Sequence, residues 1–296
     1  MGFEKYLQEA EIAASKRKGI MHLEKAKPSE FLELARDIMK SGNGQMKDVK
    51  ISLKVDGAGI RFGKDSRGRF FFETSRSGPI QQKKAFTAYA SQKDGADLTR
   101  ARHYDDMYDH IEASNLWRDL PPDTKVVAEI LYNPMAEILQ DKVKFVSVSY
   151  DKSKLGSLMT IIPLDVVVSS TGRTHDDKDK IIKGLLKKSN SEIKVESAEL
   201  KGTTLNVETI LKPIFALGSD IDRVLASRKA SDKAKKELYQ IVIQNVKDQL
   251  AKFILEHPGI VGKDKFGPEI EGLVLDFGGR QFKVTTSAFK ASKQKV

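Results

Sequence analysis

The sequence predicts an α+β protein with antiparallel sheets, and three observations carry this prediction. Strand-like runs are joined by short turn signals at residues 65–68 and 278–279, which are typical of antiparallel hairpins. Segments with helical periodicity stand apart from these runs, at residues 28–40 and 83–118. The chain of 296 residues is long enough to bury a full core and contains no apolar run of transmembrane length.

Composition narrows the classes of partner. The chain has 51 basic and 41 acidic residues, a formal net charge of +10 that favours a polyanion, nucleic acid before membrane. The need for solubility alone can also explain a basic chain. Cysteine is absent, which excludes disulfides and thiolate metal sites and suits a reducing compartment.

Residues 1–20 predict a short leader helix, because apolar residues at helical spacing precede a basic cluster and a glycine. The apolar stretch is too short and too charged for a secretory signal. The simpler interpretation is a docking helix. Residues 6–10, Tyr-Leu-Gln-Glu-Ala, also resemble the leader of internal head proteins of large tailed bacteriophages. That resemblance implies phage head proteins as partners, cleavage after Glu9 and packaging in the virion.

An amphipathic helix is expected at residues 28–40, followed by a strand that runs through residues 51–62. Lys54 stands inside this strand and is followed at once by Asp56 and Gly57, which break the run where a turn or a close ligand would lie. Partial burial is expected to lower the pKa of Lys54 and to make its neutral amine available as a nucleophile. The alternative is a surface lysine beside a turn.

The hairpin at residues 65–68 leads into three phenylalanines at residues 70–72, whose bulk suits a sheet face packed against helices. Residues 74–79, Thr-Ser-Arg-Ser-Gly-Pro, form a turn rich in hydroxyl groups. Its guanidinium, on Arg76, suits a phosphate or ribose contact. An ordinary polar turn is the alternative.

The region of residues 83–118 contains His103 and His110 among acidic residues. Six intervening residues place the two rings nearly two helical turns apart, so we expect packing and solvation rather than metal ligation. Residues 126–132 form an apolar strand around Glu129, and a strand glutamate among apolar neighbours needs a functional reason. A further apolar strand is expected at residues 161–168.

Residues 169–262 predict a basic helical insertion, with helices at 177–188, 206–217 and 220–257. Such an insertion fits a nucleic-acid clamp or a solvated helical flap equally well. The chain then returns to the core through two strands, residues 271–277 and 280–284, joined by Gly-Gly.

The order of these motifs resembles the covalent nucleotidyltransferase superfamily of ATP-dependent polynucleotide ligases and mRNA capping enzymes. The motifs are Lys-Val-Asp-Gly at 54–57, Thr-Ser-Arg-Ser-Gly at 74–78, Ala-Glu-Ile at 128–130, Ile-Ile-Pro-Leu-Asp at 161–165, Glu-Gly-Leu-Val at 271–274 and Phe-Lys-Val at 282–284. The resemblance implies a ligase-type nucleotidyltransferase domain over residues 21–296. It would place antiparallel sheets around a nucleotide cleft, with the insertion at about 169–262.

The resemblance also implies the chemistry: Lys54 takes AMP from ATP as a phosphoramide, with Mg²⁺ as the metal. The residues expected to bind nucleotide are Asp56, Gly57, Arg61, Arg76, Glu129 and Lys283. Glu271 and Glu129 are expected to hold the metal. The acceptor would be nicked duplex DNA or RNA, in the cytoplasm of an infected host cell.

Two departures from the family keep alternatives open. Pro163 and Leu164 replace the aromatic residue that usually stacks on the purine, which leaves the choice of base open. Few residues follow Lys283, so a carboxyl-terminal oligonucleotide-binding fold is not expected. A GTP-using capping-like enzyme and a catalytically inactive virion protein that binds nucleic acid are the two alternatives.

Overall fold

The chain forms two compact units, each built around its own sheet. The computed structural model describes residues 21–22, 48–74, 77–93, 95–139, 142–145, 148–206, 231, 233–234, 237, 240–241, 272–277 and 280–285. The first unit contains the described part of Asp56–Ala198, and the second contains the described parts of Lys18–Val55 and Glu199–Val296. The predicted leader, the helix expected at 28–40, Arg76 and Glu271 lie outside the described residues.

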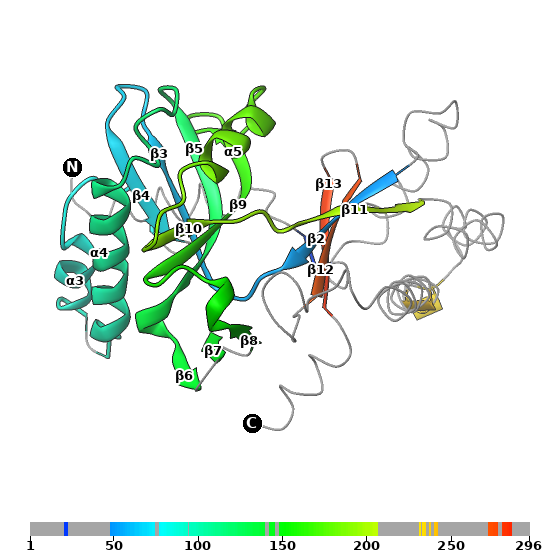
Figure 1. Ribbon diagram of the computed structural model, residues 1–296, viewed down its shortest axis with the longest axis horizontal. Helices are drawn as coiled ribbons and strands as arrows, with labels where there is room; N and C mark the ends of the chain where they lie inside the picture. The colour runs from blue at the N-terminus through cyan, green and yellow to red at the C-terminus, as the bar shows by residue number, and fades with distance from the viewer. Residues whose placement is uncertain are drawn as a thin grey trace. The chain divides into compact units, whose positions relative to one another are not determined.

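The first unit is organised on a five-stranded sheet in the order β10-β9-β5-β3-β4 (Figure 1). Its strands are β3 (Ala58–Lys64), β4 (Phe70–Thr74), β5 (Thr124–Tyr132), β9 (Met159–Val168) and β10 (Ile193–Val195). Every neighbouring pair is antiparallel except β9 and β10. The strands predicted at 126–132 and 161–168 are therefore confirmed.

The β3–β4 hairpin confirms the turn predicted at residues 65–68 and owes its shape to Asp65 and Gly68. Gly68 has a φ of +76°, a left-handed conformation that glycine adopts at little cost. The Asp65 carboxylate accepts hydrogen bonds from the backbone N–H groups of Arg67 and Arg69 and from the Gln81 side chain. Partial burial would raise the pKa of Asp65, but the bonds from Arg69, Gln81 and Arg67 together outweigh it and lower the pKa to about 2.

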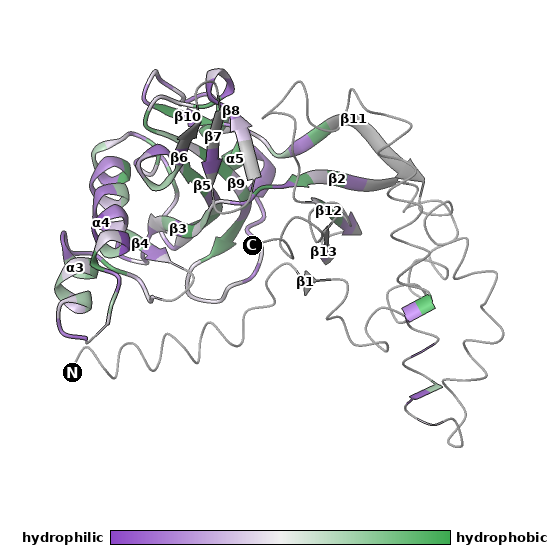
Figure 2. Cartoon of the chain, turned by 90° about the horizontal axis from the view of Figure 1, so that it is seen from below, coloured by the Kyte–Doolittle hydropathy of each residue, from purple (hydrophilic) through white to green (hydrophobic). Residues whose placement is uncertain are grey.

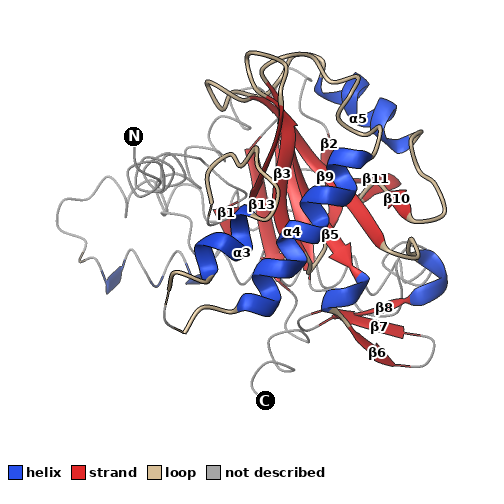
Figure 3. Cartoon of the chain, turned by 90° about the vertical axis from the view of Figure 1, so that its left-hand side faces the viewer, coloured by secondary structure: helices blue, strands red, loops and turns tan. Residues whose placement is uncertain are grey.

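Helices α3 (Ala85–Ala90) and α4 (Leu98–Ala113) cover one face of this sheet (Figure 3). They confirm the helical character predicted for residues 83–118. Asp97 caps the amino end of α4 by accepting a hydrogen bond from the Arg100 N–H. The buried Asp105 carboxylate on α4 does the same for α3, because it accepts bonds from the N–H groups of Phe86 and Thr87.

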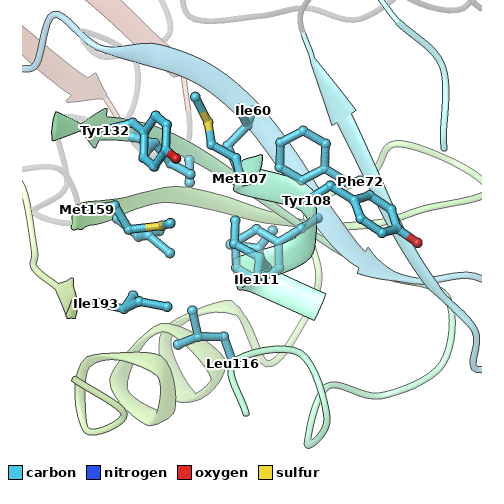
Figure 4. Packing of buried hydrophobic residues seen from close by; sticks show 14 of the residues in the cluster. Ile60, Phe72, Met107, Tyr108, Ile111, Leu116, Tyr132, Met159 and Ile193 are labelled. Atoms are coloured by element: carbon cyan, nitrogen blue, oxygen red, sulfur yellow. The ribbon is translucent and has the colours of Figure 1, made fainter. Parts of the chain in front are cut away.

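The main core lies between these helices and the sheet (Figure 4). Phe72 from β4 meets Phe86 and Tyr108 edge to face, with ring centroids 5.8 and 6.3 Å apart. Figure 2 shows hydrophilic and hydrophobic residues on the same helix α4, as expected for a helix with one face on a core.

A three-stranded sheet β6-β7-β8 and helix α5 (Lys178–Leu186) complete this unit. The three strands are β6 (Glu137–Leu139), β7 (Lys142–Phe145) and β8 (Val148–Asp151).

The second unit contains a five-stranded sheet in the order β1-β13-β12-β2-β11. Its strands are β1 (Met21–His22), β2 (Asp48–Lys54), β11 (Glu199–Asn206), β12 (Gly272–Phe277) and β13 (Arg280–Thr285). Residues Phe277 and Arg280 are paired, which confirms the hairpin predicted at residues 278–279. Ile51, Leu53 and Leu275 are buried and form the apolar side of this sheet.

The helical insertion predicted for residues 169–262 is only partly correct. Helix α5 confirms the helix expected within 177–188. Residues 193–195 and 199–206, which fall between the helices predicted at 177–188 and 206–217, form strands β10 and β11, so the predicted insertion is not helical throughout. Ile193 and Val195 alternate with Lys194 and are buried beside β9, which is strand rather than helix periodicity. Within the described residues, no helix has the length and apolar character that crossing a membrane requires.

Candidate functional site

Lys54 ends β2 on the face of the second unit's sheet that lies opposite Ile51 and Leu53. Ile51 and Leu53 are buried, at 0% and 2% exposure, whereas Ser52 and Lys54 are half-buried. Because successive side chains of a strand point to opposite faces, Lys54 points away from the apolar side. The strand predicted through residues 51–62 is two strands in the structure, β2 ending at Lys54 and β3 beginning at Ala58, which belong to the sheets of different units. The predicted break at Asp56 and Gly57 lies between them.

Lys283 projects from the same face as Lys54. Val274 on β12 is directly opposite both Ser52 on β2 and Lys283 on β13, and Gly272 is opposite Lys54. Residues directly opposite one another in antiparallel strands have side chains on one face. One strand separates β2 from β13, and Lys54 lies two residues further along its strand than the position level with Lys283, so the two Cα atoms are about 12 Å apart. Two long cationic side chains at this separation suit a polyphosphate.

The loop after Lys54 is anchored in the first unit by a residue that sequence reasoning missed. The Asp56 N–H donates a hydrogen bond of 2.9 Å to the hydroxyl oxygen of Tyr150 on β8, which is 3% exposed. At Gly57, a Cβ atom would lie 2.5 Å from the Ile130 carbonyl oxygen. The loop thus requires glycine at this position because its backbone passes against β5. No local pattern could reveal Tyr150, since its partner is 94 residues away.

Arg61 and Glu129 share the face of the first unit's sheet that lies opposite the helical core. Arg61 on β3 is directly opposite Val127 on β5, and Glu129 is directly opposite Gly59. A Cβ atom at Gly59 would lie 3.5 Å from Glu129 Oε1, an ordinary van der Waals distance, so the Glu129 carboxylate lies over this glycine. The Arg61 guanidinium donates a hydrogen bond of 3.1 Å to the Thr74 carbonyl. The sheet thus brings one predicted cation and one predicted anion to the same surface.

A buried ion pair lies on that same face and was not predicted. Lys125 Nζ is 2.8 Å from Glu73 Oε1, and the two side chains are 4% and 0% exposed. Gly63 on β3 is opposite Lys125 on one side and Phe71 on the other, so the lysine crosses over Gly63. Its amine lies 5.6 Å from the centre of the Phe71 ring. A Cβ atom at Gly63 would overlap the backbone of the neighbouring strand.

Pro163 and Leu164, where the sequence departs from the family pattern, lie at a bulge in β9. Val127 pairs with Asp165 and Ala128 pairs with Pro163, so Leu164 is the extra residue. A bulge tolerates proline inside a sheet because one ladder hydrogen bond is already interrupted. The Asp165 carboxylate lies 2.9 Å from Lys178 Nζ on α5.

The two histidines take different surroundings. The His103 ring meets Tyr132 edge to face at 5.9 Å, and His110 is exposed. Burial, with a smaller contribution from Asp106, raises the pKa of Tyr132 to about 12. In the part of the chain that the structure describes, no group of three or more His, Cys, Asp or Glu side chains could hold a metal ion. Glu129 alone fits a metal only as one ligand beside phosphate oxygens and water, an arrangement that Mg²⁺ accepts.

The predicted site residues therefore fall into two sets. Lys54 and Lys283 share one sheet face in the second unit, and the residues of the first unit are Asp56, Gly57, Arg61 and Glu129. Arg76 and Glu271 lie outside the described residues.

Comparison with known proteins gives matches among solved structures. No family model matches the sequence, and no curated protein does. A mutant RNA ligase of Naegleria gruberi solved with ATP and Mn is 10% identical and has a TM-score of 0.42, over 95% of this chain and 59% of that chain. Two forms of an archaeal ATP-dependent RNA ligase are 15% and 16% identical, with TM-scores of 0.38 and 0.36. They cover 93% and 87% of this chain, and 49% and 47% of their own. The chain thus spans about half to three fifths of the length of these ligases.

Proposed function

We propose that the chain is an ATP-dependent nucleotidyltransferase of polynucleotide-ligase type, with Lys54 as the nucleophile. The observation that carries the proposal is the placement of Lys54 and Lys283 on one face of a single sheet. Ile51, Leu53 and Leu275 are buried on the opposite face, and Val274 is buried on the face of the two lysines. The shared face would allow both lysines to contact one anionic ligand.

The step is a phosphoryl transfer. The lone pair of neutral Lys54 Nζ attacks the α-phosphorus of ATP and forms a P–N bond. The bond from the α-phosphorus to the bridging oxygen breaks, and pyrophosphate leaves with that electron pair. The amine loses one proton to solvent. A nucleic-acid end with a 5′-phosphate then accepts the AMP, and the amine is restored.

Each of the other residues has a role in this step. Lys283 would neutralise phosphate oxygens on the face that presents Lys54, and Arg76 would contact phosphate or ribose. Arg61 and Glu129 would bind the nucleotide on the sheet face of the first unit. A bound Mg²⁺ would spread charge from the phosphoryl oxygens, with Glu129 and Glu271 as its protein ligands.

The test is covalent labelling. The chain is incubated with Mg²⁺ and either ATP or GTP labelled at the α-phosphate, then analysed on a denaturing gel and by intact mass. We expect one acid-labile AMP on Lys54, and we expect Lys54→Ala and Lys54→Arg to lose it while still folding. Lys50→Ala is the matched control, since Lys50 stands on the same face of β2, four residues earlier and exposed.

Other outcomes identify the alternatives. Label from GTP instead of ATP would indicate a capping-like enzyme. Absence of label from both nucleotides, with nucleic-acid binding retained, would indicate an inactive virion protein. An adduct that persists in Lys54→Ala would show that Lys54 is not the nucleophile.

A further inference from the structure

The outer side of α5 carries exposed lysines in line. Lys180, Lys183 and Lys187 are all exposed, and their spacing places them along one side of the helix over about 10 Å. The inner side is apolar, since Leu185 is buried in the core and Ile181 packs against it. The three lysines therefore point away from the rest of the unit.

These lysines differ from the two that flank them. Lys178 pairs with Asp165 at 2.9 Å, and Lys188 pairs with Asp119 at 2.7 Å. Among the described residues, no carboxylate forms an ion pair with Lys180, Lys183 or Lys187.

The line of charge is not needed by the helix itself. Like charges three and four positions apart destabilise a helix by a few tenths of a kcal/mol. The helix dipole favours cations near the carboxyl end, which accounts for Lys183 and Lys187 but not for Lys180. Acidic residues occur at the amino end of α5, at positions 176, 177 and 179, where Asp176 and Asp179 stand four residues before Lys180 and Lys183. Lys187 has no acidic residue three or four positions before it, and an external polyanion would offset its repulsion with Lys183.

Lys188 at the end of α5 joins the helix to the loop of residues 115–119, which carries the exposed Arg118 and Asp119. Lys188 Nζ donates a hydrogen bond of 2.6 Å to the Asn115 carbonyl, and Lys64 Nζ donates one of 2.6 Å to the Arg118 carbonyl. These bonds fix the loop and leave the Arg118 side chain exposed. The hydrogen bond and charge of Lys188, with a smaller contribution from the charge of Lys64, lower the pKa of Asp119.

We propose that this surface binds the backbone phosphates of one nucleic-acid strand. The surface, here named the α5 ridge, consists of Arg118, Lys180, Lys183 and Lys187. Its three lysines span about 10 Å, the axial rise of about three phosphates on one strand. The proposal that the ridge holds the acceptor strand rests on the proposed ligase-type function. Binding of nucleic acid by the ridge does not itself require catalysis.

The absence of apolar anchors distinguishes this partner from a membrane. A helix that lies in a membrane surface presents large apolar side chains beside its lysines. Over the described part of the chain, the exposed large hydrophobic residues are Leu98 and Ile241, and neither belongs to the ridge.

The test is a titration of a fluorescein-labelled single-stranded RNA 20-mer by anisotropy at several salt concentrations. The variant replaces Lys180, Lys183 and Lys187 with alanine, which preserves helix propensity. We expect the slope of log K against log salt to fall by about 2, since each phosphate contact on a single strand contributes about 0.7. Affinity at low salt should fall by at least tenfold.

The matched control replaces three exposed cations outside the ridge, Lys93, Arg102 and Lys152, with alanine. It removes the same net charge, and we expect it to leave affinity and slope unchanged. Equal losses in both triple variants would show that net charge alone attracts RNA and would overturn the ridge. Unchanged binding in the ridge variant, no RNA binding by the wild type, or stronger binding to phosphatidylserine vesicles than to RNA would also overturn it.

Adenylation of Lys54, measured without nucleic acid, separates the two proposals. We expect the ridge variant to form the AMP adduct as the wild type does. An absent adduct with ridge-dependent RNA binding would refute the proposed function and leave the ridge standing. A normal adduct, with RNA binding that does not depend on the ridge, would refute the ridge and leave the proposed function standing.

Discussion

Breaking the buried ion pair between Lys125 and Glu73 should destabilise the first unit strongly. At 2.8 Å and an effective dielectric of about 20, the gross attraction is about 6 kcal/mol. Desolvation of both ions offsets most of this. Lys125→Met leaves the carboxylate buried without the lysine, which costs about 3–5 kcal/mol, and Arg61 directly opposite Glu73 favours the lower end of this range.

The fluorescence of Trp117 allows the unfolding of the first unit to be measured. It is the only tryptophan of the chain and packs on Phe70 at 5.1 Å, so its fluorescence reports unfolding of the first unit. Urea unfolding should give a large loss for Lys125→Met and Glu73→Gln alone. The double variant should lose at least 2 kcal/mol less than the sum of the singles, because neither ion is then left alone. Single losses below about 1 kcal/mol, or additive losses, would refute the reasoning and show that water reaches the pair.

Three further predictions concern other described contacts. Asp65 has a folded pKa of about 2, below its ordinary 3.8, so its contribution to stability is present above pH 3.8 and is lost as pH falls toward 2. Asp65→Asn should remove that part of the acid dependence in urea unfolding at pH 2–5, and an unchanged pH dependence would contradict it. Asp105→Ala removes the cap of α3 and should cost about 2–3 kcal/mol by the same assay, whereas a loss under about 0.5 kcal/mol would show that water replaces the cap. Tyr150→Phe frees the Asp56 N–H and should slow single-turnover adenylation about tenfold at saturating ATP, since small misplacements reduce rates strongly. Tyr108→Phe, a buried tyrosine of the core, should leave that rate unchanged, and equal rates in the two variants would contradict a positioning role.

The elements that could be predicted from sequence are those with a local signal. The strand that ends at Lys54, both hairpins and the long strand around Glu129 show alternation or turn residues within a few positions. Strands β10 and β11 were missed because only a few apolar residues mark them. Their partners, β9 and β2, lie about 30 and 150 residues earlier in the chain.

The site was predictable only where a residue was conspicuous in its own strand. Glu129 stands out among apolar neighbours, and Lys54 stands out before Asp-Gly. Lys125 is the second residue of β5 and has the pattern of an ordinary surface lysine, although it reaches across Gly63 to a carboxylate 52 positions earlier. The alternation of side chains along the strand could have revealed Lys125. Lys125 and Glu129 are four residues apart and therefore share a face of β5, and each is opposite a glycine of β3.

The four residues of the Lys-Val-Asp-Gly motif have different reasons for being there. The boundary between the two units falls after Val55, whose side chain is 5% exposed. Gly57 is needed by the fold, because any Cβ atom there would overlap the backbone of β5, and the backbone N–H of Asp56 is held by Tyr150. Asp-Gly at this place is thus explained in large part by packing and is weak evidence for chemistry. Lys54 is half-buried at the end of β2 and stands on the face that also presents Lys283. The functional inference therefore depends on the lysine and on its shared face with Lys283, and that is the placement the adenylation assay tests.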